Sequence, residues 1–578
     1  TKVYAAFGRG ARRDWKRAAR KTVFSHYWMA IMVCLVAAFL GTEFTGSLES
    51  LHFTRQKWDV ISNFLASFGR PGAAANSRGV FAIAVNKIAD GSLQNIVNNT
   101  IMLLAGSSEF WQSFGIVVSS LVSMTYWVLV THTFVVILRR LFMEMRVYEE
   151  VPPYRALYLH SARCWGRTSL ALLRVAVQRG LWWLTIIGGA IKTFSYYLCG
   201  FILAENPTMK GGDAIALSRK MMNGHKWECF LLELSFVPWH LLSLATFGLS
   251  SLFYSSAYLS AARCEFYAAV RAQVKAEGEA QALRDTYLFE KAGAKTLRRA
   301  YNDLGKPAEK LPERVYGNKV TRFFGECLGV TLFVNPQDVA REKIQDREYR
   351  LRYMRRCEQG LSYPIRLSPL LQYEHKDHEP ALFTRKYPVT TLVLLFFLFS
   401  IIGWCWEVVL HLLSEGTFVN RGVLHGPWLP IYGTGGVLVL LTLYKLRDKP
   451  WLEFWATVVV CGVVEYFTAY YLETVYDRRW WDYAGYFLNL HGRICAEGLL
   501  VFGLGGMAVV YGVAPLFDNL LHKVRHSVLI GLCAALIALF CVDQAYSHFH
   551  PNEGEGITDE VVYKTDDARI RLDEEAFV

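Results

Sequence analysis

Two polar stretches interrupt the apolar C-terminal part of the sequence, and they hold most of the side chains that could do chemistry. The stretches are residues 416–436 and 476–493, and the candidate residues in and beside them are Glu407, Asn420, Arg421, Glu465, Asp482, Asn489, His491 and Arg493. Ionisable groups at membrane depth are rare and mark functional sites by default. One interpretation is a polar pocket in which Arg421 and Arg493 bind an anionic or lipid-linked group and the three carboxylates position them.

The same side chains allow a second interpretation. Carboxylates that pair with arginines remove the cost of burying each charge alone, so these residues could form ion pairs that only pin the ends of helices. Substitution separates the two. If there is a pocket, Arg493→Ala abolishes function while the protein still folds and inserts. If there are only structural pairs, that variant fails to accumulate in membranes.

Glycine and proline recur in the first polar stretch, at Gly422, Gly426, Pro427, Pro430 and Gly433. Such a stretch cannot form a continuous helix. At membrane depth, non-helical backbone survives only when it is buried in protein or lines a water-filled cavity, and broken helices of this kind build substrate sites in transporters. We predict a re-entrant loop or broken helix near Pro427, formed by Gly426, Pro427, Pro430 and Gly433. An ordinary interfacial loop is the alternative.

The composition of the whole chain is that of a membrane protein. The 578 residues are 53% hydrophobic and only 19% charged, whereas soluble domains carry about 25% charge. The net charge of +12 arises mainly from Lys and Arg beside apolar runs, which indicates a lipid bilayer as partner and gives no sign of nucleic acid. The sequence predicts an all-α polytopic membrane protein with two helical transmembrane modules joined by a cytoplasmic helical region.

Apolar runs near the roughly 20 residues that cross a bilayer define the regions of this fold. Expected spans lie near residues 27–45, 114–138, 181–203, 228–244, 249–267, 389–412, 433–444, 451–472, 499–516 and 528–542. They give an N-terminal membrane module (1–267), a charged cytoplasmic helical region (268–386), a five-span C-terminal module (387–546) and an acidic exposed tail (547–578). Lys192 interrupts the third span, and it indicates either a cavity or a bent, partly exposed helix.

The N-terminal half resembles a known bacterial family. The runs ILAENP (202–207) and AIALSRKMMNGHKWECFLLELSF (214–236), a Thr-x-Gly at 246–248 and EFY at 265–267 are similar to the integral-membrane family called domain of unknown function 975, over about residues 10–270. That family has no established activity, so the resemblance implies a fold and no reaction.

A second resemblance covers about residues 387–516. The motifs GWCWE (403–407), NRGVLHGPWLPIYG (420–433), EYF (465–467), WWDY (480–483) and NLHGRIC (489–495) resemble the putative ABC-transporter type IV, or CmpB-like, family. This label implies a permease role. Both families imply a bacterial cytoplasmic membrane, and the basic residues at 8–21 ahead of the first span predict that the N-terminus is inside.

Enzymatic motifs do not accompany these features in the sequence. We find no GxxxxGK[ST], GxSxG or HExxH and no carboxylate-rich metal motif, so we expect no cofactor and no metal and keep an enzyme only as an alternative. The leading function is a permease-like transport component whose polar site faces outward. Any ATPase would be a separate subunit that docks on residues 268–386. The alternatives are a non-transporting scaffold or regulator and a membrane-embedded enzyme acting on a lipid or lipid-linked group.

Overall fold

The computed structural model confirms an all-α polytopic membrane fold. It describes residues 7–44, 109–246, 248–278, 282–304, 318–332, 336–369, 385–415, 418–476, 483, 490–550 and 552. Contacts divide the chain into two compact units, which are described separately below. The N-terminal unit takes Thr1–Trp58, Ile83–Leu311 and Lys343–Pro380, and the C-terminal unit takes Asp59–Ala82, Pro312–Glu342 and Ala381–Val578.

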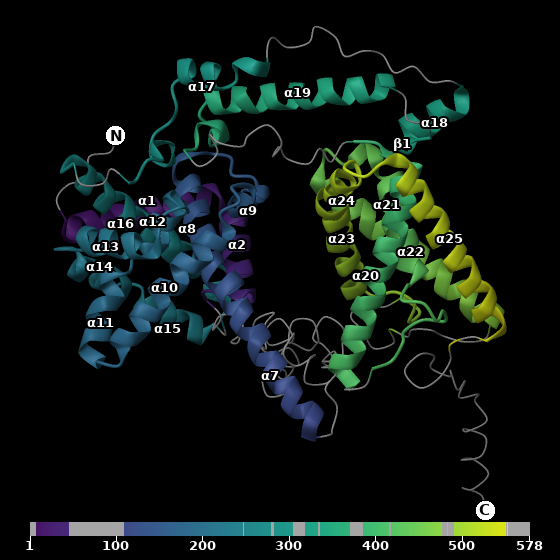
Figure 1. Cartoon of the computed structure of the whole chain (residues 1–578), viewed down its shortest axis with the longest axis horizontal. Coiled ribbons are helices and arrows are strands. Elements are labelled where there is room, and N and C mark those ends of the chain that lie inside the picture. Colours follow the sequence, from purple (N-terminus) through teal and green to yellow (C-terminus); the bar gives the residue numbers. More distant parts are fainter. Residues whose placement is uncertain are drawn as a thin grey trace, which may run out of the picture. The chain divides into compact units, whose positions relative to one another are not determined.

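The N-terminal unit is built from many helices, several of them short (Figure 1). They are α1 (Arg9–Ser25), α2 (Tyr27–Phe39), α7 (Glu109–Tyr126), α8 (His132–Val147), α9 (Tyr158–Ser161), α10 (Trp165–Trp183), α11 (Ile186–Ser195), α12 (Cys199–Glu205), α13 (Gly211–Met221), α14 (Lys226–Leu234), α15 (Val237–Ala245), α16 (Ser256–Ala276) and α17 (Ala294–Ala300). Three 3₁₀ turns at Pro153–Leu157, Thr286–Leu288 and Asn302–Leu304 and a fourth at Ile365–Leu367 complete it.

The basic first helix packs into this unit instead of lying free. Its buried residues, Ala11, Trp15, Ala19 and Val23, recur every four positions, so they line one face of α1. That face contacts α16, where the rings of Trp15 and Phe266 pack edge to face with their centroids 5.6 Å apart. Helix α2 then turns away from α1 by 97°.

The C-terminal unit holds longer helices that run alongside one another, drawn green to yellow in Figure 1. Its elements are α18 (Lys319–Cys327), β1 (Val330–Thr331), β2 (Tyr387–Pro388), α20 (Val389–Glu415), α21 (Pro430–Thr442), α22 (Pro450–Tyr476), α23 (Ala496–Ala508), α24 (Ala514–Leu521) and α25 (His526–Phe549), with a 3₁₀ turn at Tyr444–Leu446. Helix α20 packs against α21 and α25, and α22 packs against α23.

Glycines allow the close helix packing in this unit. A Cβ atom on Gly433 would lie 2.5 Å from the Phe396 carbonyl oxygen of α20, and one on Gly503 would lie 2.6 Å from the Phe454 ring of α22. Both distances are far shorter than a normal contact. Replacing either glycine would therefore force the two helices of that pair apart.

The predicted region 268–386 is divided between the two units. Its residues up to 304 and from 343 to 369 fold with the N-terminal unit, while residues 318–332 and 385–388 fold with the C-terminal unit. In the latter, β1 and β2 form a short parallel pair in which Val330 lies opposite Tyr387. The boundary falls inside α19 (Pro336–Glu358).

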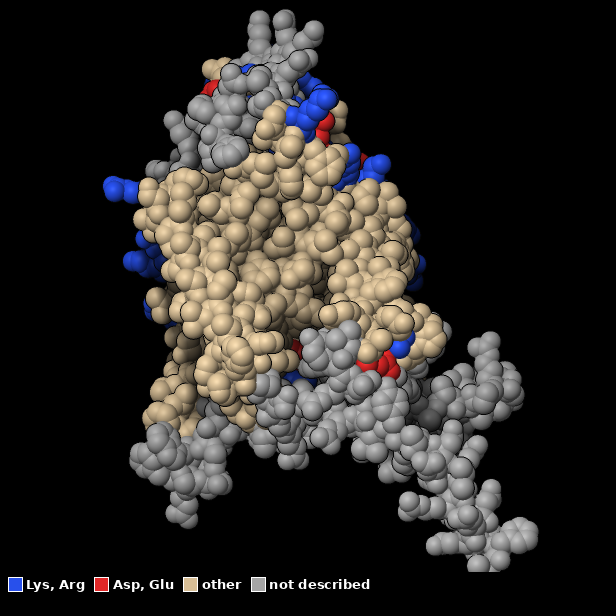
Figure 2. All heavy atoms as spheres, turned by 90° about the vertical axis from the view of Figure 1, so that its right-hand side faces the viewer, with Lys and Arg blue, Asp and Glu red and all other residues tan. Residues whose placement is uncertain are grey.

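Seven helical segments within the described residues are long and apolar enough to cross a membrane. They are Ser113–Val147, Ile186–Glu205, Lys226–Ala245, Val389–Val409, Pro450–Tyr471, Gly498–Leu521 and His526–Phe549. Helices α1 and α2 are long and apolar enough to cross a membrane only when they are taken together as one broken span. Helix α21, at the expected span 433–444, is apolar but shorter. On the C-terminal unit, Figure 2 shows uncharged residues covering the middle of one face, with Lys and Arg along its upper edge.

Two sequence expectations meet a different local structure. The expected span at 249–267 is not among the seven segments, because it continues into the largely buried α16, which carries Arg263, Glu265 and Arg271. The expected span at 181–203 is found as the spanning segment Ile186–Glu205 and starts later than expected, because α10 ends at Trp183 and α11 begins at Ile186. Lys192 is half-buried with its ammonium 4.6 Å from the centroid of the Trp182 ring, which fits the bent, partly exposed helix.

Three helices contain a π-helical turn, at Trp127–Thr131, Ser251–Ser255 and Val509–Val513. Such a turn adds one residue to a helical repeat, and π turns are frequent at functional sites. Each of these turns is followed directly by an α-helix, with no loop between them.

Candidate functional site

The predicted site residues gather at one end of the C-terminal unit. Helix α20 brings Glu407, the segment before α21 brings Asn420 and Arg421, and α22 brings Glu465. We call the group Trp404, Glu407, Asn420, Arg421, Tyr432, Glu465 and Tyr483 the polar site. Basic side chains mark the opposite end of the same helices. There Arg447 donates to the Arg385 carbonyl oxygen at 2.9 Å, and Arg385 pairs with Asp518, also at 2.9 Å.

Non-helical backbone forms one wall of the polar site. Residues 418–429 are not helical, and α21 begins at Pro430, where the missing N–H of proline costs nothing. The Leu429 N–H donates to the Ser400 carbonyl oxygen of α20 at 3.0 Å. Gly426 and Pro427 lie in this non-helical segment, whereas Pro430 and Gly433 lie inside α21, and a re-entrant loop formed by the four residues stays a prediction.

Asp543 of α25 holds this segment in place. Its carboxylate accepts hydrogen bonds from the backbone N–H groups of His425 (3.2 Å) and Gly426 (3.0 Å) and from the Trp428 indole N–H (2.7 Å). Sequence reasoning missed this residue. A single acidic residue inside the apolar run of α25 was the available signal, because such a residue needs partners in a membrane.

Asn552 fixes the other part of the segment. Its side-chain amide donates to the carbonyl oxygens of Asn420 and Gly422, at 2.8 Å each, and its backbone N–H donates to the Val423 carbonyl oxygen at 3.1 Å. Asn420 in turn accepts from the indole N–H of Trp404 at 2.6 Å. Asn420 therefore shapes the loop, and its side chain links it to α20.

Arg421 meets a carboxylate across the polar site. Its guanidinium lies 3.8 Å from Glu407, whose other oxygen accepts a hydrogen bond from the Tyr432 hydroxyl at 2.5 Å. The side chains of Arg421 and Glu407 are 27% and 29% exposed, so this pair can be reached from outside. A long ion pair that is still accessible can exchange its carboxylate for an anionic ligand.

Glu465 is the buried carboxylate of the polar site. The residue is 6% exposed, and its Oε1 accepts a hydrogen bond from the Tyr483 hydroxyl at 3.1 Å. Burial and the charges of Glu465 and Glu407 raise the pKa of Tyr483 above its usual value. Tyr432 also lies within electrostatic range of Glu465 and Tyr483, so these four side chains form one group. Both tyrosines belong to quoted motifs, but their roles were not recognised in the sequence.

Arg493 and His491 form a separate cluster. Arg493 pairs with Glu473 at 2.7 Å and donates to the Tyr466 hydroxyl at 3.1 Å, and the His491 ring nitrogen Nδ1 lies 2.9 Å from the same hydroxyl. The hydrogen bond to Glu473 is the main reason why the pKa of Arg493 is raised. Arg421 and Arg493 thus pair with different carboxylates, Glu407 and Glu473, and their binding of one shared anion stays a prediction. Asp482 and Asn489 lie outside the described residues.

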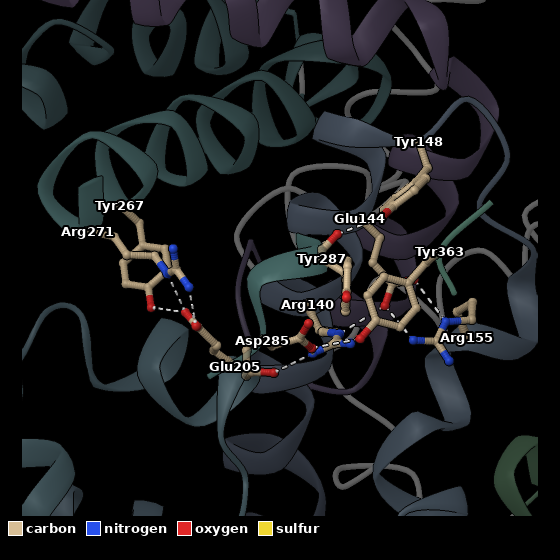
Figure 3. A network of polar contacts seen from close by, with 11 residues as sticks. Arg140, Glu144, Tyr148, Arg155, Glu205, Tyr267, Arg271, Asp285, Tyr287 and Tyr363 are labelled. Carbon is tan, nitrogen blue, oxygen red and sulfur yellow. Dashed lines mark hydrogen bonds and ion pairs between the residues drawn. The ribbon is translucent and has the colours of Figure 1, made fainter. Parts of the chain in front are cut away.

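The N-terminal unit has a buried polar network of its own, seen from close by in Figure 3. Glu144 accepts hydrogen bonds from both Arg140 (2.9 Å) and Arg155 (2.8 Å), and Arg140 also pairs with Asp285 at 2.9 Å. The Tyr363 hydroxyl donates to the same Asp285 oxygen at 2.7 Å. This network joins α8 to two segments that lie more than a hundred residues later in the chain.

A second part of the network lies apart from the first in Figure 3. Arg271 makes two hydrogen bonds to Glu205, at 2.8 and 2.5 Å, and the Tyr267 hydroxyl donates to Glu205 at 3.0 Å. Burial alone would lower the pKa of Arg271, but the bonds to Glu205 raise it. All three residues are at most 5% exposed. This geometry is that of a structural ion pair, because the guanidinium and the carboxylate satisfy each other.

Two family models match the chain, one over each of these regions. Residues 394–548 match the family model described as putative ABC-transporter type IV, and residues 19–274 match the model of a protein of unknown function, DUF975. Both resemblances are confirmed. The first match covers the helices α20 to α25 that build the polar site, whereas the second covers most of the N-terminal network. Comparisons with curated proteins and with solved structures gave no match.

The polar site combines charged and hydroxyl side chains. It offers one accessible guanidinium, two carboxylates and two tyrosine hydroxyls. Within the described part of the chain, no group of three His, Cys, Asp or Glu residues is arranged to hold a metal ion. The side chains at hand can bind an anionic group through Arg421 and exchange protons through the carboxylates.

Proposed function

We propose that this protein is a permease-like transport component whose ligand site is the polar site of the C-terminal unit. The observation that carries the proposal is the coincidence of two results. The family match labelled as ABC-transporter type covers residues 394–548, which include the ion pair of Arg421 with Glu407 and the buried Glu465. Broken helices that meet polar residues in a membrane are the usual construction of a transport site.

The proposed ligand is an anionic or lipid-linked group bound by Arg421. The ion pair between Arg421 and Glu407 is longer, at 3.8 Å, than the pair between Arg493 and Glu473, at 2.7 Å, and its two side chains are 27% and 29% exposed. A ligand phosphate or carboxylate would replace Glu407 as the partner of Arg421. Arg493 then has a supporting role, since it fixes the loop before α23 through Glu473.

Orientation follows from the two ends of the C-terminal unit. The end with Arg385, Arg447 and Lys523 is basic, and positive charge favours the cytoplasmic side. We therefore place the polar site on the outer side of a bacterial cytoplasmic membrane and the N-terminus inside. A separate ATPase subunit would dock on region 268–386, where α19 exposes Arg352 and Arg355.

Purification from native membranes in a mild detergent tests the proposal. Mass spectrometry of the purified material should find a stoichiometric ATPase subunit, a bound anionic molecule, or both. Arg421→Ala should weaken retention of that molecule about 10- to 100-fold, because a hydrogen bond to a charged group contributes about 1.5–3 kcal/mol. Arg298→Ala serves as the matched control, since Arg298 forms an exposed ion pair with Glu358 on the N-terminal unit.

Two results would count against transport. A solitary chain that retains no ligand would favour a scaffold. An Arg421→Ala protein that binds the molecule as tightly as the wild type would move the ligand away from the polar site. If Arg421→Ala instead fails to accumulate while Arg298→Ala accumulates normally, the pair with Glu407 is structural.

A further inference from the structure

Helix α22 carries a row of polar residues that winds slowly around it. Glu453, Thr457, Cys461 and Glu465 follow one another at intervals of four, so each neighbouring pair is in contact range but offset by about 40°, and Glu453 and Glu465 are about 120° apart around the helix. The Thr457 hydroxyl donates to the Glu453 carboxylate at 3.0 Å. Cys461 lies within electrostatic range of both glutamates. The two carboxylates are therefore about 18 Å apart along the helix axis, at 1.5 Å per residue.

Neighbouring helices shield this row from solvent. A Cβ atom on Gly506 of α23 would lie 2.5 Å from the Thr457 methyl group, and one on Gly462 of α22 would lie 2.7 Å from Leu499. Glu453 is fully buried and Glu465 is 6% exposed. Both carboxylates thus occupy a low-dielectric environment, and both belong to a helix that is long and apolar enough to span a membrane.

Each of these carboxylates has an oxygen atom with no hydrogen-bond partner in the described part of the chain, namely Oε2 of Glu453 and Oε2 of Glu465. No ion pair of either residue is formed there. Arg447 lies within electrostatic range of Glu453, but its guanidinium donates to the carbonyl oxygens of Arg385 and Leu440.

In the described part of the chain, the titratable groups that face Glu465 are acids. Tyr483 donates to it from the loop. The other titratable groups facing it are Glu407 of α20, Tyr432 of α21, Cys461 one turn earlier in α22 and, beyond Tyr483, Cys495 at the start of α23. Among the described residues Glu465 forms no ion pair, and Arg421 pairs with Glu407 instead.

An ionised carboxylate in this position would be a buried charge with a single hydrogen bond, which is costly. A carboxylic acid avoids that cost, because the proton removes the charge and supplies a donor at the unpartnered oxygen. We propose that Glu465 is a proton-binding residue of the polar site, with Glu453 as a second proton-binding residue at the other end of α22. The proton on Glu465 comes from water at the loop end and returns there.

This inference deepens the proposed function, on which its link to transport rests. Ligand binding at Arg421 releases Glu407 from its ion pair and adds negative charge beside Glu465. Added negative charge favours protonation, so binding of an anionic ligand is accompanied by uptake of a proton. The structure therefore assigns proton-coupled anion binding to this site, in addition to any work done by a separate ATPase.

Infrared spectroscopy of the full chain in lipid nanodiscs tests the proton directly, without a ligand. At about pH 7, where free carboxyl groups are ionised, the wild type should show a carbonyl band of protonated carboxylic acid. Glu465→Gln and Glu453→Gln should each remove part of this band. Glu473→Gln is the control and should leave it unchanged, because Glu473 is ion-paired with Arg493. A Glu465→Gln spectrum identical to that of the wild type would overturn the proposal.

A second measurement keeps the test valid if a variant does not fold. A hydrophobic carbodiimide reacts with protonated carboxyl groups in membranes, so the wild-type protein labelled at about pH 6 and about pH 9 should carry more adduct on Glu465 at the lower pH. Peptide mass spectrometry locates the adduct, and Glu473 serves again as the internal control. If adding sodium at constant pH removes the infrared band and adding choline does not, the carboxylate binds a metal cation in place of a proton, and the proton proposal is wrong. If Glu465 is protonated but the purified chain retains no ligand, the proton-binding proposal stands and the proposed transport function is wrong.

Discussion

The two units of this protein differ in how they neutralise buried carboxylates. In the N-terminal unit, Glu144, Glu205 and Asp285 each form an ion pair with a buried arginine, although Oδ1 of Asp285 has no hydrogen-bond partner among the described residues. In the C-terminal unit, Glu453 and Glu465 are as deeply buried, yet among the described residues neither forms an ion pair and each leaves one oxygen without a partner. Burial of charge alone is thus a poor guide to function. Whether the charge is satisfied separates a structural network from a site that must take up something else.

The comparison is tested most strongly by the same substitution in both units. Glu144→Gln should destabilise the protein by about 3–5 kcal/mol, because Arg140 and Arg155 would remain buried without their counter-charge. That loss corresponds to a fall of about 10 °C in the midpoint of thermal unfolding, measured in detergent by size-exclusion chromatography after heating. A variant as stable as the wild type would show that the N-terminal network is not structural.

Loss of the Asp543 contacts should give the next largest effect. In Asp543→Asn, one side-chain oxygen becomes an NH₂ group that faces the donors of Gly426 and Trp428, so we expect a cost of about 1–3 kcal/mol in holding residues 418–429. Trypsin provides the measurement, since cleavage after Arg421 should become about tenfold faster. Cleavage after Arg298 in the N-terminal unit is the control site and should not change.

Glu453→Gln should have a smaller effect than either. A glutamine has the shape of a protonated glutamate and keeps an acceptor for the Thr457 hydroxyl, so a change below about 1 kcal/mol is expected if Glu453 carries a proton. The thermal midpoint should stay within a few degrees of the wild type, about 2–4 °C per kcal/mol. A fall as large as that of Glu144→Gln would mean that Glu453 is ionised, and the contrast between the two units would be lost.

The pH dependence of Tyr483 is the finest test. Its pKa is raised in the folded protein, so the stability that it contributes is fully present below the unfolded value of about 10 and is lost as pH rises above it. Tyr483→Phe removes this pH-dependent contribution to the stability. Between about pH 9 and about pH 11 the wild type should therefore lose more thermal stability than Tyr483→Phe. Equal losses would mean that Tyr483 does not share the buried environment of Glu465.

Much of the architecture could be read from the sequence, because apolar length and basic flanks report membrane spans directly. The helical break before Pro430 was expected from the glycines and prolines there, and pairing of arginines with carboxylates was expected without its partners, one pair of which is Arg421 with Glu407. The span expected at 249–267 is not among the seven segments found in the described residues, and hydropathy does not show that α16 continues into Arg271 and pairs with Glu205. Pairing of this kind depends on contacts between helices that are distant in the sequence.

The candidate site was predicted in composition more than in arrangement. Arg421 and Arg493 were expected on one ligand, but each has its own carboxylate, and the partner Glu473 was not recognised because it lies in an aromatic helix end. Asp543 was overlooked for a related reason. A single acidic residue shows that a partner must exist, but only the fold shows that this partner is the backbone of His425 and Gly426.

The π-helical turns bear on how the chain can change length. In the turn at Val509–Val513, one residue is in excess of the α-helical repeat. Deleting a single residue there would restore a regular helix and leave both flanking faces in register. The same deletion in α22, between Glu453 and Glu465, would rotate one carboxylate by about 100° relative to the other. Insertions and deletions among relatives should accordingly collect at the three π turns and be missing from the polar row of α22.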